Sequence, residues 1–86
     1  MDFVLAFEST HAALAAQRSF TAAGAAFALI PTPRAISAGC GMSLRFSAEG
    51  EDAARAVAGR HVPPEARPLA ALYVRDGEER YRAIAW

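Results

Sequence analysis

Residues 3–11, Phe-Val-Leu-Ala-Phe-Glu-Ser-Thr-His, are the stretch that decides the fold. The first five form a continuous apolar run that ends at Glu8, a pattern typical of a buried central strand. Ser9 and Thr10 follow, and either hydroxyl can accept a hydrogen bond from a free amide in the first turn of a helix. The stretch therefore predicts a strand that passes directly into a capped helix.

The predicted helix covers residues 11–23, which are rich in alanine. Leu14, Gln17 and Phe20 recur in it at helical spacing, and Gly24 follows at the place of a left-handed C-cap. Small residues on one side would allow a close approach to a sheet. The face that we expect to pack there is formed by Ala13, Ala16, Phe20 and Ala23.

The rest of the chain predicts four more strands and one more helix. Pro31 should stop the second strand because proline cannot donate to a ladder. An amphipathic helix is predicted over residues 49–59, ending at a glycine, and a proline-rich connector that includes His61 follows it. The Asp-Gly pair at 76 and 77 is a strong hairpin signal. The predicted strands are residues 26–30, 42–47, 69–74 and 80–86.

This order of elements favours an α+β fold in one domain over residues 1–86. The topology that fits is a ferredoxin-like split β-α-β, with two helices on one face of an antiparallel sheet and a C-terminal β-hairpin extension. The loop after the second strand would then lie at the rim of the sheet, where functional residues are common.

Composition excludes several classes of protein. Hydrophobic residues make up 53% of the 86 residues and charged residues 21%, which is ample for one core and argues against disorder. The net charge is zero, so no overall electrostatic footprint for nucleic acid or an anionic membrane exists. All nine basic side chains are arginines, whose forked donors suit oxyanions, and the absence of lysine excludes Schiff-base chemistry.

One cysteine and two histidines give neither an internal disulfide nor a zinc-binding spacing, so no metal or other cofactor is expected. The start Met1-Asp2 lacks the basic character of a signal peptide, and no apolar run approaches the ~20 residues of a membrane helix. We therefore expect a cytoplasmic protein.

Residues 30–46 gather the only cysteine of the chain with two arginines, two prolines and two glycines. Prolines stiffen the start of this loop, and Gly39 and Gly41 allow unusual backbone angles on either side of Cys40. A reachable thiol in electropositive surroundings has a lowered pKa and becomes a nucleophile. The alternative is that Cys40 is a small buried hydrophobe, as lone cysteines often are.

Arg34, Ser37 and Arg45, with amides around Gly39 and Gly41, are candidates for holding an anion near the thiol. The competing interpretation of Arg34 is a solvated arginine or a weak surface ion pair. His11 is a candidate proton shuttle to the thiol, although a histidine at a helix start more often caps or packs there.

The order of residues along the chain resembles a family of small bacterial proteins described as selenium/sulfur carrier-like. The resemblance covers about the first half of the chain and does not extend to the C-terminal hairpin. It implies a ferredoxin-like domain whose Cys40 holds sulfur or selenium as a persulfide or perselenide, passed between donor and acceptor proteins. The residues that carry it are Phe7 to His11, Gly24, Leu29 to Arg34, Ile36, Ser37, Cys40, Gly41 and Leu44 to Phe46.

We therefore expect a sulfur or selenium carrier rather than an enzyme, since the sequence offers no self-contained catalytic constellation. The alternative is a regulatory module that binds a small anion or a protein through the Arg34 loop, with no covalent chemistry. A redox switch through intermolecular disulfides needs only an exposed Cys40. A cysteine hydrolase would need His11 and Glu8 around a pocket that 86 residues can hardly enclose. Homodimerisation is left open, and the apolar end at Trp86 could meet a partner or finish the core.

Overall fold

The structure is a computed structural model that describes residues 1–37 and 41–86. It contains five strands, two α-helices and one short 3₁₀ helix. No helix among these residues is both long enough and apolar enough to cross a membrane. In chain order the elements are β1 (Asp2–Phe7), α1 (Thr10–Ala22), β2 (Ala28–Pro31), β3 (Met42–Ser47), α2 (Glu51–His61), η1 (Arg67–Leu69), β4 (Ala70–Gly77) and β5 (Arg80–Ile84).

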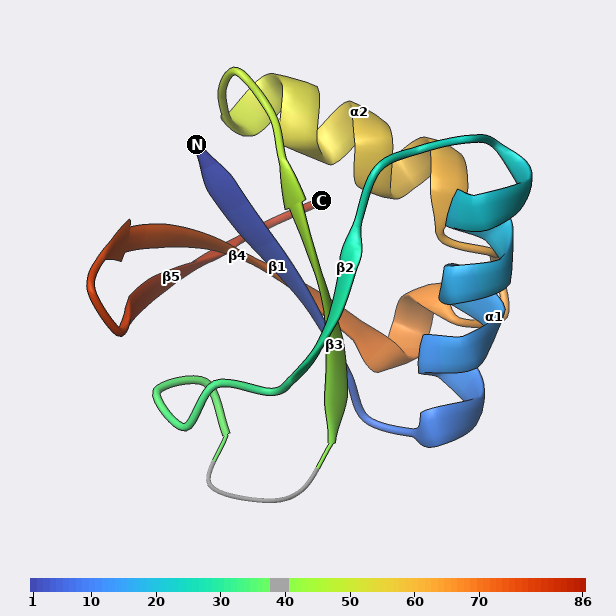
Figure 1. Cartoon of the computed structure of the whole chain (residues 1–86), viewed down its shortest axis with the longest axis horizontal. Helices are drawn as coiled ribbons and strands as arrows, with labels where there is room; N and C mark the ends of the chain where they lie inside the picture. The colour runs from blue at the N-terminus through green and yellow to red at the C-terminus, as the bar shows by residue number, and fades with distance from the viewer. Residues whose placement is uncertain (38–40) are drawn as a thin grey trace.

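The strands form one antiparallel sheet in the order β2-β3-β1-β4-β5, with β1 in the centre. Both helices lie on the same face of this sheet (Figure 1). The first four strands of this order make the ferredoxin-like split β-α-β arrangement, and β5 extends the sheet beyond β4. The predicted fold class is confirmed, together with the C-terminal hairpin extension.

The junction between β1 and α1 has the geometry that the sequence predicts. Ser9 is the N-cap in an extended conformation, and its Oγ accepts a hydrogen bond of 3.1 Å from the amide of Ala12. At the other end Gly24 takes a φ of +69°, which glycine adopts without steric cost. The amide of Ala25 then donates to the carbonyl of Phe20 at 2.9 Å, so the helix ends in a closed turn.

The second helix ends later than predicted. It continues through Gly59 to His61, which is therefore the last helical residue and not part of a loop. The amide of Val62 still donates to the carbonyl of Ala58 at 2.9 Å, and Pro63 follows. The glycine prediction was wrong because a glycine with ordinary helical angles does not break a helix that tertiary packing supports, whereas the proline cannot continue it.

The C-terminal hairpin turns two residues later than predicted. Asp76 and Gly77 belong to β4, and the register pairs Gly77 with Arg80, so Glu78 and Glu79 form the turn. Glu79 supplies the positive φ, at 58°. The ladder also shifts register just before Gly77, and this irregularity moves the turn away from the Asp-Gly pair.

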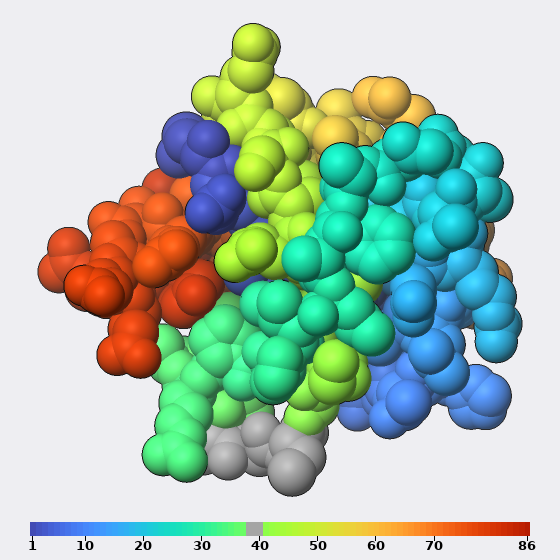
Figure 2. Space-filling view, viewed as in Figure 1, coloured from blue at the N-terminus to red at the C-terminus, as the bar shows by residue number. Residues whose placement is uncertain are grey.

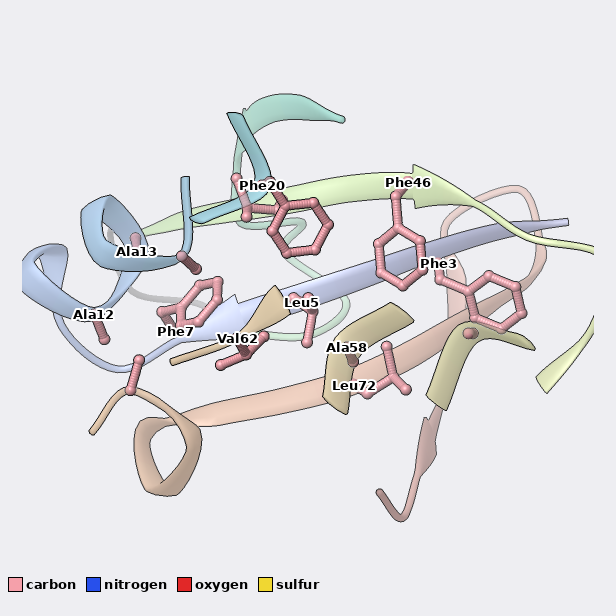
Figure 3. Close-up of a cluster of buried hydrophobic side chains, with 14 of the residues drawn as sticks. Phe3, Leu5, Phe7, Ala12, Ala13, Phe20, Phe46, Ala58, Val62 and Leu72 are labelled. Carbon is pink, nitrogen blue, oxygen red and sulfur yellow. The ribbon is translucent and has the colours of Figure 1, made fainter. Parts of the chain in front are cut away.

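The core lies between the helices and the sheet and is rich in phenylalanine (Figure 3). Phe3 and Phe46 stack with ring centroids 5.8 Å apart, and Phe20 lies 6.1 Å from Phe46. Three of the four residues predicted for the inner face of α1 are buried. The fourth, Ala23, is exposed because the helix ends before it, and Ala12 is buried instead.

The other face of the sheet carries no helix. Side chains alternate along a strand, so Val4 and Ala6 lie on this face while Leu5 and Phe7 enter the core. Val4 is nevertheless almost fully buried, and the register places it between Arg45 and Tyr73. On this helix-free face, neighbouring side chains of the sheet therefore shield Val4 from solvent.

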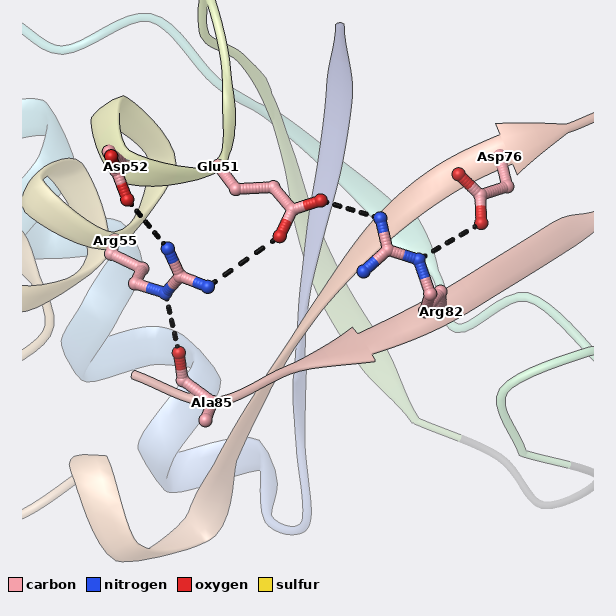
Figure 4. Close-up of polar contacts among 6 residues, drawn as sticks. All are labelled: Glu51, Asp52, Arg55, Asp76, Arg82 and Ala85. Atoms are coloured by element: carbon pink, nitrogen blue, oxygen red, sulfur yellow. Dashed lines mark hydrogen bonds and ion pairs between the residues drawn. The ribbon is translucent and has the colours of Figure 1, made fainter.

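Arginines attach the C-terminal hairpin to α2 (Figure 4). The Glu51 carboxylate accepts from Arg82 at 2.5 Å and pairs with Arg55 at 3.5 Å. Arg82 also reaches Asp76 at 3.2 Å, and Arg55 donates to the carbonyl of Ala85 at 2.8 Å. The hydrogen bond from Arg82 holds the pKa of Glu51 below its usual value.

A second arginine contact fixes the last residue. Arg67 donates to the carbonyl of Trp86, and its guanidinium lies 4.5 Å from the centre of the Trp86 ring. Ile84 is buried and Trp86 is partly buried against the core. Within this chain, the apolar end of the sequence therefore helps to finish the core.

Candidate functional site

The loop between β2 and β3 is closed at its base by two contacts. The amide of Thr32 donates to the carbonyl of Gly41 at 3.0 Å. The hydroxyls of Thr32 and Ser43 share a hydrogen bond of 2.7 Å, and Ser43 is completely buried. A buried hydroxyl without a partner would be costly, so this pair fixes where the loop leaves and rejoins the sheet.

The first half of the loop forms a tight turn. The amides of Ile36 and Ser37 both donate to the carbonyl of Pro33, at 2.9 and 3.1 Å. The turn folds toward the helix-free face, where its residues lie close to the C-terminal hairpin (Figure 2). Ile36 is half-buried there, so the loop is packed against the sheet and does not project freely into solvent.

A pocket of about 400 Å³ lies between this turn and the end of the sheet. We call it the loop pocket. The end of β1, the loop and the start of β4 meet around it, and the amide of Glu8 donates to the carbonyl of Leu69 at 2.9 Å. The residues that line it are Ala6, Phe7, Glu8, Thr32, Ile36, Ser37, Gly41, Leu69, Ala71 and Tyr73.

Gly41 lies tightly in the wall of the loop pocket. A Cβ at this position would be 3.4 Å from the Thr32 hydroxyl and 3.9 Å from the carbonyl oxygen of Phe7. The first distance is tighter than most real contacts, and the Thr32 hydroxyl is already held by Ser43. A larger residue at position 41 would therefore press on the base of the loop.

The loop pocket offers hydroxyls and a single charge. Glu8 is the only charged side chain among the described residues that line it, and its residue is exposed. Thr32, Ser37 and Tyr73 contribute hydroxyl groups, and the other lining side chains are apolar. Such a lining is suited to a small polar group with an apolar part and, because of Glu8, to positive charge in preference to negative.

The residues predicted for the site are only partly brought together. Ser37 and Gly41 line the loop pocket, whereas Arg34 is exposed on the turn and is not among the lining residues. Gly39 and Cys40 lie outside the described residues. The exposure of the thiol therefore stays a prediction from the sequence.

Arg45 lies farther along β3, on the helix-free face. The register aligns it with Val4, which in turn is aligned with Tyr73. Arg45 is among the residues that line another pocket, of about 360 Å³, together with His61 and the start of β2. Arg45 and the loop pocket therefore share a face of the sheet, but Arg45 is not part of the pocket wall.

His11 occupies the first turn of α1 and is exposed. It lines a hollow of about 270 Å³ with Arg18 and Glu65. Leu69 borders both this hollow and the loop pocket. His11 is thus near the same end of the molecule as the loop, on the other side of Leu69.

Over residues 1–37 and 41–86, no group of three or more His, Asp or Glu side chains could hold a metal ion. Sequence analysis missed several residues that shape the loop pocket, namely Thr32, Ser43, Leu69 and Tyr73. The alternation of β3 carries no signal for Ser43, because it places Ser43 on the same side of the strand as the exposed Arg45 and Ser47.

No curated protein and no solved structure matches this chain. A family model does match residues 2–66, which include β1, α1, the loop and α2 and leave out β4 and β5. The family is described as "Putative Se/S carrier protein-like". Because this match covers well over half of the 86 residues, the chain belongs to the Se/S carrier protein-like family.

Proposed function

We propose that the protein carries sulfur or selenium on Cys40 and transfers it between partner proteins. The observation that carries the proposal is the family match, because it spans the whole cysteine loop. The loop geometry supports it further. Gly41, which follows Cys40 in the sequence, lines a pocket large enough for a small sulfur compound or for the side chain of a partner.

The proposed chemistry is an exchange at sulfur. The Cys40 thiolate attacks the outer sulfur of a persulfide on the donor, the sulfur–sulfur bond of the donor breaks, and the donor leaves as a thiolate. Cys40 then holds the outer sulfur as a persulfide. No external oxidant or reductant is needed, because the transferred sulfur keeps its oxidation level. Transfer to an acceptor nucleophile repeats the same exchange.

A loaded persulfide is anionic at neutral pH, so donors near it would stabilise the cargo. Ser37 and the amides of Gly39 and Gly41 are the proposed donors within the loop, and Arg34 is the proposed cation. Arg45 would act from the helix-free face at longer range. His11 remains a proposed proton shuttle that would have to act past Leu69.

Loading by a cysteine desulfurase tests the proposal. After incubation of the protein with the desulfurase and cysteine, intact mass measurement should show the addition of one sulfur atom, removable by reductant. Cys40→Ala should gain nothing. A protein that stays at its original mass, under conditions that load a known carrier, would overturn the assignment. The same assay with a selenium donor would distinguish the two cargoes.

Two further parts of the proposal concern context. We propose that residues 1–86 act as one carrier domain in the cytoplasm, where thiols stay reduced and persulfides can be handed on. Its partners would be a donor protein and an acceptor protein. Size-exclusion chromatography with light scattering, under reducing and mildly oxidising conditions, would establish whether the carrier also pairs with itself.

A further inference from the structure

Glu8 is among the residues that line the loop pocket, and Gly41, which also lines it, follows Cys40 directly in the sequence. We propose that the loop pocket selects a partner that bears a primary ammonium group close to its sulfur, the chemistry of an aminothiol. This inference rests on the proposed function and adds the class of compound that the site prefers.

The wall of the pocket gives the first argument. Glu8 lies directly after β1, and its backbone is held by the hydrogen bond from its amide to Leu69. Its side chain makes no ion pair within the described residues, although Asp76 of the hairpin and Glu51 of α2 are both paired with Arg82. Glu8 is therefore the charged group available to a ligand in this pocket.

The position of the cations gives the second argument. Arg34 belongs to the same loop but does not line the pocket, and Arg45 lines a different one. A negatively charged compound would gain from Arg34 only outside the pocket and would meet Glu8 inside it. The hydroxyl of Tyr73 can accept from an ammonium group but can equally donate to an anion, so Glu8 alone sets the sign of the charge that the pocket prefers.

The family match gives the third argument. It ends at residue 66, whereas Leu69 at the end of η1 and Ala71 and Tyr73 in β4 complete the pocket. The family match thus includes the residues that line the pocket on the side of the loop. It does not include the residues that form the opposite wall. Tyr73 is the residue through which β4 would adjust the choice of compound.

Three disulfides of nearly equal length test the inference, namely cystamine, 2-hydroxyethyl disulfide and dithiodiglycolate, which are cationic, neutral and anionic. Cys40 should exchange with each, and each rate is divided by the rate of the same reagent with free 2-mercaptoethanol. At low salt, we expect the normalised exchange rate of cystamine to exceed that of the neutral reagent by about 1.5- to 5-fold, the range of an exposed charge pair. This difference should become smaller as salt is added.

Variants assign the effect to the pocket. Glu8→Gln should remove the lead of cystamine, whereas Glu65→Gln, on the neighbouring hollow, should keep it. Equal normalised rates, or a lead for dithiodiglycolate, would overturn the inference and favour Arg34 as the dominant charge.

A second measurement separates this inference from the proposed function. In a Cys40→Ser chain, ethanolamine at low salt should shift the amide resonances of Glu8, Ser37 and Tyr73 more than ethylene glycol does. If Cys40 reacts with none of the three disulfides, the carrier proposal fails, and the titration still decides whether the pocket prefers an ammonium group. Identical shifts with both compounds would overturn the inference.

Discussion

The cysteine loop and the C-terminal hairpin are attached to the same sheet by different kinds of contact. At the loop, the hydroxyl pair of Thr32 with the fully buried Ser43 and backbone hydrogen bonds fix the geometry. At the hairpin, exposed arginines reach carboxylates and carbonyls across α2, β4 and β5. The difference implies that the neutral contacts at the base of the loop are insensitive to salt, whereas the attachment of the hairpin depends on salt and on the ionisation of Glu51.

The largest effect should come from the core that both regions share. Phe20 is fully buried and touches Phe27, Phe46 and His61. Phe20→Ala should cost about 3–5 kcal/mol of unfolding free energy, through lost transfer energy and an unfilled cavity. Urea unfolding followed by circular dichroism measures it. Leu14→Ala, at an exposed site on the same helix, should cost far less unfolding free energy. Similar costs for the two variants would mean that α1 does not pack on the sheet through the face that carries Phe20.

A smaller effect is expected at the base of the loop. Ser43→Ala removes the partner of the Thr32 hydroxyl and should cost about 1–2 kcal/mol, with faster hydrogen exchange at the Thr32 amide. Ser47→Ala is the matched control, because the Ser47 hydroxyl donates to Asp2 at the surface and its loss should cost under about 0.5 kcal/mol. The comparison fails if the two serines prove equivalent.

The ion pairs of the hairpin should matter less and should depend on salt. Arg82→Gln is expected to lower the midpoint of urea unfolding only slightly at low ionic strength. Most of this difference should vanish in 1 M salt, where the screening length falls to about 3 Å. Arg80→Gln, in the same hairpin but with no ion pair among the described residues, is the control. A salt-independent loss in Arg82→Gln would show that packing, not charge, holds the hairpin.

The smallest effect should be seen in acid. Arg82 lowers the pKa of Glu51 in the folded state, so the pairing stabilises the protein above the ordinary pKa of glutamate, roughly 4.3. This stabilisation is lost as the pH falls below that value and through the lowered pKa. Glu51→Gln should therefore flatten the acid side of a plot of melting temperature against pH. An unchanged acid side would mean that Glu51 titrates like a free glutamate.

Local signals made the fold predictable. The apolar run of β1, the Ser9 cap and the Gly24 turn each report on neighbours in sequence, and all three are confirmed. The end of α2 and the hairpin turn were misplaced because tertiary packing decides them. Gly59 is tolerated inside a packed helix, and a shift of register in β4 leaves the Asp-Gly pair in the strand, before the turn.

The site was less predictable, because it depends on which residues the sheet brings together. The pairing of Thr32 with Ser43 needs the register of β2 and β3, and Tyr73 reaches the loop pocket only through the pairing of β1 with β4. Arg45 follows the cysteine closely in sequence, yet four strand residues carry it along the sheet to another pocket. Proximity in sequence could therefore indicate which loop forms the site, but not which residues line the loop pocket.

The backbone at Glu79 has a consequence for how the protein opens. A side chain held at a φ of 58° raises the local energy by about 1–2 kcal/mol, and only two strands meet at that tip. Fraying should therefore begin there and advance along β4 from its far end, reaching Tyr73 late. Leu69 and Ala71, which also line the loop pocket, lie beside the opposite end of β4, so opening of the hairpin tip can leave that part of the pocket in place.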